Sequence, residues 1–126
     1  MSNAPPERSW RLDKAERFLQ AAGRAFEADD WETTVSRAYY AVYHAVIALL
    51  EEKTDLRIPR RHPQLHNLLR TPYVSPILTS RDALDVQKLF FARLAANYGN
   101  EQFGMSDAQE SLARAGAICQ RIFQAV

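Results

Sequence analysis

Apolar residues recur at intervals of three and four along nearly the whole chain, and this spacing is the strongest constraint on the fold. Such intervals place side chains on one face of an α-helix, whereas a half-buried strand would show strict alternation. The chain also has only 4 glycines among 126 residues and few alternating β-branched runs. The sequence therefore predicts an all-α protein.

Four long helices are expected from this pattern. They cover about residues 8–28, 31–52, 79–98 and 106–126. Prolines at positions 59 and 63 exclude a continuous helix through the segment between the second and third of these, which leaves room for one short helix at residues 63–70. Connections this short favour antiparallel neighbours. We therefore predict an up-and-down antiparallel four-helix bundle with an additional short helix between the second and third long helices.

The helix starts carry recognisable capping patterns. Asp29 followed by Glu32, and Ser106 followed by Gln109, have the spacing of a capping box. Thr79 or Ser80 is suited to cap the third long helix. A tetratricopeptide hairpin is a minor alternative for the first two helices, but no further repeat follows them. Residues 1–7 are expected to be a disordered tail, and residues 8–126 a single domain.

Composition limits the class of protein. The chain has 16 Lys+Arg and 15 Asp+Glu, a formal net charge of +1, which argues against binding nucleic acid or membrane over the whole surface but not against a local patch. A single cysteine, Cys119, excludes an internal disulfide and fits a reducing compartment. No apolar run approaches the roughly 18 residues of a membrane span, and the first residues do not resemble a signal peptide. A cytoplasmic protein without membrane partners is expected.

The second helix combines core residues with a polar stripe. Apolar residues occupy almost every angle around it, yet Arg37, Tyr40 and His44 share one side. Arg37 and His44 are seven residues apart, which places them within roughly 20° of each other and about 10 Å apart along the axis. A guanidinium, a phenol and an imidazole in this arrangement would suit a phosphate-containing ligand.

This stripe has two interpretations from spacing alone. In the catalytic one, Arg37 binds a scissile phosphate and His44 acts as acid or base in RNA cleavage. In the structural one, these side chains form interhelical hydrogen bonds and ion pairs with residues such as Asp13, Glu16 or Asp85. Spacing leaves both open.

Further candidates lie later in the chain. The segment 57–81 contains five arginines and two histidines without an acidic residue, and it is a candidate contact for RNA phosphates. Its candidate contact residues are Arg57, Arg60, Arg61, His62 and His66. On the third long helix, Arg93 and Asn97 share a stripe that ends beside Tyr98, and these three are candidate assisting or ligand-binding residues. No glycine-rich phosphate loop, H-E-x-x-H motif or Cys/His quartet is present, so we expect neither a metal nor a cofactor.

Several stretches resemble one family. "SRAYYAVYHAVIALL" is similar to the second helix of a prokaryotic branch of HEPN domains, and "HPQLHNLL" and "FFARLAANYG" are similar to later segments of that branch. The resemblance covers residues 8 to 125. It implies a four- to five-helix bundle that commonly dimerises. Many such domains are metal-independent ribonucleases in toxin–antitoxin or defence systems, and others bind nucleotides or RNA beside a small nucleotidyltransferase.

The sequence departs from the catalytic form of that family. The resemblance implies an arginine, a spacer of about four to six residues and then a histidine on a late helix, but Arg93 is followed after four residues by Tyr98. We therefore expect a module of a homodimer that binds RNA, a nucleotide or a partner, with any nucleotidyltransferase antitoxin a separate protein. One alternative is a metal-independent endoribonuclease toxin that uses Arg37 and His44. The other is a purely structural helical interaction or dimerisation protein.

Overall fold

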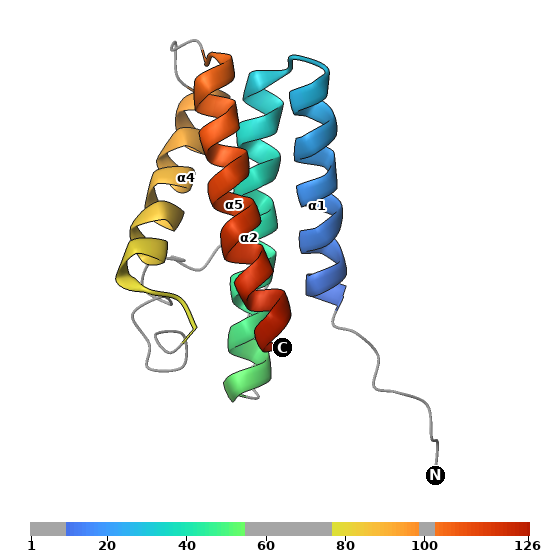
Figure 1. Cartoon of the computed structure of the whole chain (residues 1–126), viewed down its shortest axis with the longest axis vertical. Coiled ribbons are helices and arrows are strands. Elements are labelled where there is room, and N and C mark those ends of the chain that lie inside the picture. The colour runs from blue at the N-terminus through green and yellow to red at the C-terminus, as the bar shows by residue number, and fades with distance from the viewer. Residues whose placement is uncertain (1–9, 55–76, 99–102) are drawn as a thin grey trace.

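A computed structural model of the protein describes residues 10–54, 77–98 and 103–126. They form helices α1 (Trp10–Glu27), α2 (Trp31–Thr54), α4 (Ser80–Tyr98) and α5 (Met105–Ala125). These residues contain no strand, and each labelled helix runs opposite to the one before it (Figure 1). The predicted all-α, up-and-down bundle is confirmed. The predicted tail at residues 1–7 and the short helix at residues 63–70 lie outside the described residues.

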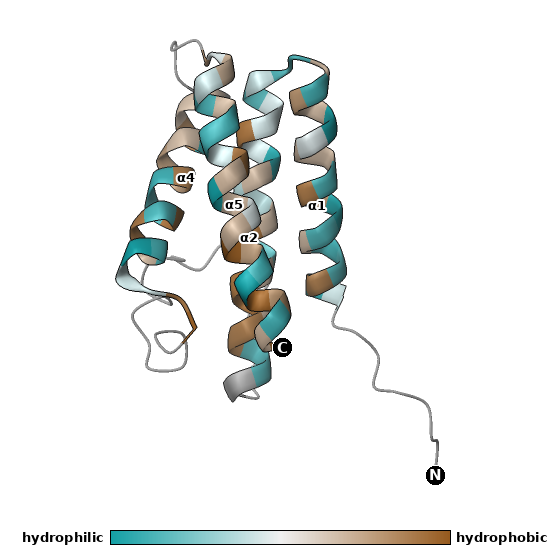
Figure 2. Cartoon of the chain, in the orientation of Figure 1, coloured by the Kyte–Doolittle hydropathy of each residue, from teal (hydrophilic) through white to brown (hydrophobic). Residues whose placement is uncertain are grey.

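Helix α2 is the centre of the bundle. It packs against α1, α5 and α4, and α5 also contacts both α1 and α4. Between Ala38 and Leu50, every residue of α2 is buried except Tyr40 and His44. Helix α1 has one apolar and one polar side: its ribbon is brown toward α2 and teal on its outer side (Figure 2). Burial of apolar surface on α2 by three neighbouring helices is therefore the main source of stability.

The turn between α1 and α2 places the N-cap of α2 at Asp30, one residue later than the predicted Asp29. Asp29 adopts φ 59°, a left-handed conformation that ends α1 and that aspartate tolerates better than most residues. Asp30 then caps α2, because its carboxylate accepts hydrogen bonds from the backbone N–H of Thr33 at 3.3 Å and from the Thr33 hydroxyl at 2.7 Å. The predicted capping box of Asp29 with Glu32 is therefore wrong.

Of the capping predictions for α4 and α5, the first is confirmed and the second is wrong. Thr79 caps α4 as predicted, since its hydroxyl accepts from the Asp82 N–H at 3.1 Å and its own N–H donates to the Asp82 carboxylate at 2.9 Å. Helix α5 begins after Gly104, whose N–H donates to the Asp107 carboxylate at 3.0 Å. Ser106 lies inside the helix, so its predicted capping role is wrong.

The apolar stripe of α5 packs mainly against α2 and closes one side of the core. Cys119 is fully buried in this stripe. Burial raises the pKa of its thiol to about 12, so it stays protonated at neutral pH and acts as a small core residue, as the sequence predicted.

Two leucines on α4 allow a matched test of this core. Leu89 is 1% exposed and Leu84 is 48% exposed. We expect Leu89→Ala to lower the free energy of unfolding by about 2–5 kcal/mol, because it leaves a cavity. Leu84→Ala should change it by less than about 0.5 kcal/mol when both variants are measured at a protein concentration that keeps the chain monomeric. Urea denaturation followed by circular dichroism measures both, and equal losses would contradict this packing.

Candidate functional site: an aromatic and cationic pocket between α1 and α2

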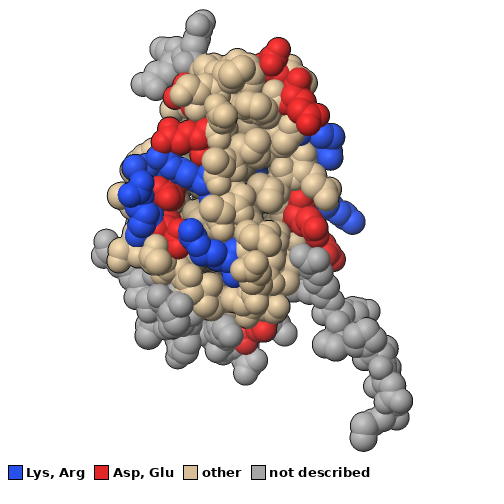
Figure 3. Space-filling model, in the orientation of Figure 1, with Lys and Arg blue, Asp and Glu red and all other residues tan. Residues whose placement is uncertain are grey.

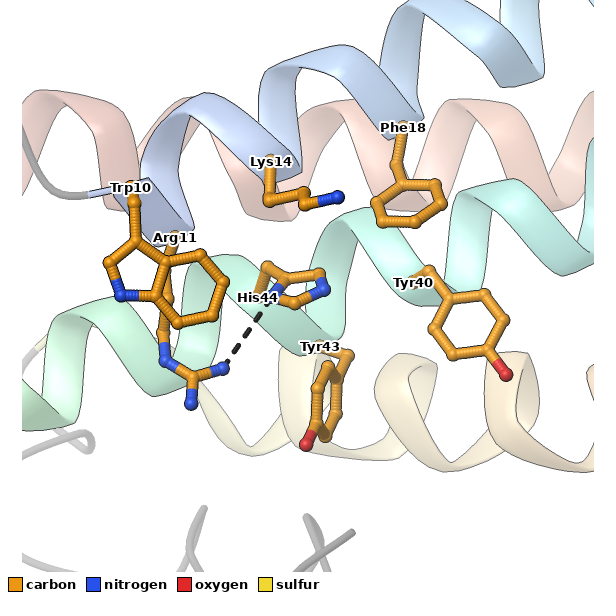
Figure 4. A pocket seen from close by; sticks show the side chains of 7 residues that line it. All are labelled: Trp10, Arg11, Lys14, Phe18, Tyr40, Tyr43 and His44. Atoms are coloured by element: carbon orange, nitrogen blue, oxygen red, sulfur yellow. Dashed lines mark hydrogen bonds between the residues drawn. The ribbon is translucent and has the colours of Figure 1, made fainter. Parts of the chain in front are cut away.

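The two incompletely buried side chains in the centre of α2 face a pocket at its contact with α1. The pocket has a volume of about 400 Å³, and α1 and α2 supply its walls (Figure 4). Its lining residues are Trp10, Arg11, Lys14 and Phe18 from α1 and Tyr40, Tyr43 and His44 from α2. This volume lies within the range of small-molecule sites in proteins.

His44 lies in the middle of this pocket, between Trp10 and Phe18 (Figure 4). Its ring is nearly parallel to that of Phe18, at an angle of 6° and a centroid distance of 5.5 Å. Trp10 and Tyr43 contact it edge-on at 5.9 and 5.1 Å. Three aromatic neighbours therefore fix the orientation of the imidazole ring.

A cation is also in contact with His44. Nη1 of Arg11 lies 3.5 Å from Nδ1 of His44, a long hydrogen bond. A guanidinium has only donors, so Nδ1 is the acceptor and the ring proton of the neutral imidazole is on Nε2. In this state His44 offers a hydrogen-bond donor through Nε2. General-base chemistry at Nδ1 would require loss of the Arg11 contact.

Arg11 is held in place by a buried ion pair. Its Nε lies 2.6 Å from a carboxylate oxygen of Glu51, and the side chains of Arg11 and Glu51 are 2% and 15% exposed. The guanidinium also lies 4.6 Å from the centre of the Trp10 ring. This pair ties the first turn of α1 to the last part of α2, and it neutralises much of the charge of Arg11.

Lys14 supplies the exposed charge of the pocket. Its ammonium group lies 5.9 Å from the ring centre of Phe18 and points into the pocket (Figure 4). None of the described residues that line the pocket is acidic. The pocket therefore combines flat aromatic surfaces with a positive potential, a combination that suits a planar anion.

A second pocket adjoins the first at Tyr40. It has a volume of about 390 Å³, and Glu32, Thr33, Ser36, Arg37 and Tyr40 line it. Tyr40 lines both pockets, so they adjoin along α2, and we call the two together the α1–α2 groove. One end of the groove is aromatic and the other is polar.

The predicted pair Arg37 and His44 is divided between the two pockets. Arg37 is exposed, and its guanidinium lies 5.7 Å from the ring centre of Phe18, the same ring that stacks on His44. Phe18 therefore contacts both side chains. The predicted shared side of α2 exists, but an aromatic residue of α1 packs against both members of the pair.

Arg93 of α4 contacts the pocket residue Tyr40 and its neighbour Tyr39. It is 8% exposed, and its guanidinium lies 5.1 Å from the Tyr39 ring and 5.3 Å from the Tyr40 ring. Its Nε has no hydrogen-bond partner among the described residues.

The phenols of Tyr39 and Tyr43 have raised pKa values. Burial raises the pKa of Tyr39 to about 12, although the positive charge of Arg93 lowers it. Burial likewise raises the pKa of Tyr43. Both phenols stay protonated at neutral pH.

Two arginines of α5 have acidic neighbours on α4 and α5. Arg121 pairs with Asp82, and Arg114 pairs with Glu110 and lies 3.4 Å from Asp85. Blue and red atoms accordingly lie together over these helices in Figure 3. Their charges largely cancel, so this surface attracts an anionic ligand less strongly than the α1–α2 groove does.

A protein-family model for the HEPN domain matches residues 9–125. The chain belongs to the HEPN domain family. No curated protein matches it. In the part of the chain that the structure describes, no helix has an apolar stretch long enough to span a membrane, and no group of three His, Cys, Asp or Glu side chains is placed to bind a metal ion.

Several predicted site residues of this HEPN domain lie beyond what the structure describes. These are the basic-segment candidates Arg57, Arg60, Arg61, His62 and His66. Helix α4 ends at Tyr98, but the side chains of Asn97 and Tyr98 are also outside the described part. Their roles stay predictions.

Sequence reasoning missed the contribution of α1 to the site. Trp10, Lys14 and Phe18 are spaced four residues apart, so one face of α1 carries an aromatic, a cation and an aromatic in succession. This spacing could have indicated the α1 side of the site. No sequence pattern indicated the Arg11–Glu51 pair, because its members are 40 residues apart in the chain.

The Arg11–Glu51 pair can be tested by a double-mutant cycle. Each of Arg11→Met and Glu51→Leu should lower the free energy of unfolding by about 3–5 kcal/mol, because each leaves the other charge buried without this partner. The double variant should lose clearly less than the sum of the two. Additive losses in urea denaturation would show that the pair does not couple α1 to α2.

Proposed function

We propose that this HEPN domain is an RNA- or nucleotide-binding module, and that the groove along α1 and α2 is its binding surface. The observation that supports this most is the pairing of the two pockets through Tyr40. Aromatic rings at one end offer stacking to bases, and Arg37 at the other end offers a charge to a phosphate. Lys14 adds a second exposed charge at the aromatic end.

The biological setting proposed for the module comes from the family. We propose a homodimer that functions in a toxin–antitoxin or defence system, with any nucleotidyltransferase partner a separate chain. Leu84 and Phe91 support a second copy, because they are seven residues apart on α4 and are 48% and 57% exposed. Large apolar side chains on one exposed face are typical of an interaction surface.

The endoribonuclease hypothesis remains the second candidate, since Arg37 and His44 do lie on one side of α2. Three features weigh against it. Nδ1 of His44 already accepts from Arg11, and the Phe18 ring contacts both members of the pair. No histidine follows Arg93 within the described part of α4. We therefore favour binding without cleavage.

Arg37 provides the test of RNA binding. Arg37→Gln should weaken binding of a labelled single-stranded RNA several-fold and lower the slope of log K against log salt by about 0.7, because one phosphate contact is lost. Arg24→Gln is the matched control, since Arg24 is an exposed arginine of α1 that lines neither pocket. Fluorescence anisotropy at several salt concentrations measures both variants.

The same samples distinguish the alternatives. We expect the RNA to remain intact in the presence of EDTA. Shortened RNA with the wild type but not with a folded His44→Ala variant would establish the endoribonuclease instead. A monomeric protein that binds neither RNA nor nucleotide would contradict the proposed function.

A further inference from the structure

One large aromatic side chain at the pocket is left half exposed. Trp10 is 46% exposed, although it begins the helix whose next residue is almost fully buried. It stands at one end of the pocket, with Phe18 at the other end and His44 between them (Figure 4). Trp10 contacts Arg11 and His44, yet nearly half of its surface stays exposed to a ligand. The second tryptophan, Trp31, packs against Phe26, with ring centres 5.4 Å apart.

The polar groups around that surface are placed for a nucleotide. His44 contributes a flat ring beside that surface, with its centre 5.9 Å from the Trp10 ring. Lys14 extends its ammonium group over the pocket (Figure 4). Arg37 lies seven residues, or about two helical turns, before His44 on α2. A base near Trp10 would thus lie close to Lys14. The sugar–phosphate chain could continue from it along α2 toward Arg37.

We propose that the Trp10 pocket takes one unpaired base of single-stranded RNA, stacked on the indole ring, with the adjoining phosphates at Lys14 and Arg37. This inference rests on the proposed function and specifies how that function is carried out. Stacking requires an accessible base face, which a duplex covers with the neighbouring base pairs. The pocket therefore selects single strands over duplex RNA. Because every base has a flat face, recognition by stacking tolerates different sequences.

The two tryptophans make the proposal directly measurable. Trp31→Phe leaves Trp10 as the only tryptophan, and Trp10→Phe leaves only Trp31, which lines neither pocket. On titration with a short single-stranded oligoadenylate, the emission of the Trp31→Phe variant should be quenched in step with binding followed by anisotropy. The emission of the Trp10→Phe variant should stay unchanged. A duplex of the same length should quench Trp10 little.

Affinity gives a second readout. Trp10→Ala should weaken binding of the single strand by roughly ten- to a hundredfold, the usual effect of removing one stacked base contact. Lys14→Gln should weaken it only several-fold and lower the salt dependence. Lys14 is exposed, so this variant keeps the proposal testable if Trp10→Ala disturbs the start of α1.

The negative outcomes are distinguishable. Binding of the oligoadenylate without quenching of Trp10 would overturn the pocket assignment and leave the proposed function standing. Absence of binding of both the oligoadenylate and adenosine monophosphate would overturn both. Adenosine monophosphate serves as the comparison probe, and if it quenched Trp10 as tightly as the oligoadenylate does, the ligand would be a free nucleotide rather than RNA.

Discussion

The enclosure of α2 by three other helices is the constraint on which the rest of the structure depends. A helix that is apolar at almost every angle must be covered on nearly all sides, and α1, α4 and α5 together do this. Only Tyr40 and His44 escape full burial in its central part. The position of the groove follows directly, because these two side chains mark the one strip of central α2 that its neighbours leave partly open.

The aromatic residues at this strip serve both packing and the site. Phe18 stacks on His44 and contacts Tyr40, while Arg93 contacts Tyr40 from α4. The walls of the groove are therefore held by contacts to three helices. A site built from side chains fixed in this way is ordered before a ligand arrives, so less conformational entropy is lost on binding.

Much of the fold could be predicted from the sequence because its determinants are local. Apolar spacing gave the four long helices to within a few residues, and the stripe of Arg37, Tyr40 and His44 was visible as a departure from that spacing. The caps were harder. Adjacent candidates such as Asp29 and Asp30 differ only in the backbone angles that the turn imposes.

The candidate site was only half predictable, since half of it comes from α1. Spacing reveals which residues share a face of one helix, but not which faces of two helices meet. The contacts of His44 with Trp10, Arg11 and Phe18 depend on the angle at which α1 packs on α2. The contact of both Arg37 and His44 with Phe18 of another helix was equally invisible, and it changes the chemistry expected of that pair.

The central claim is that nucleic acid binds on the α1–α2 side of the bundle. The most direct measurement is a two-dimensional NMR titration of isotopically labelled protein with a short single-stranded RNA, following every backbone amide. The account predicts that the largest shifts fall in residues 10–18 and 36–44, with little change in residues 110–121 of α5. Shifts concentrated on α4 and α5, with the α1–α2 amides unchanged, would contradict it.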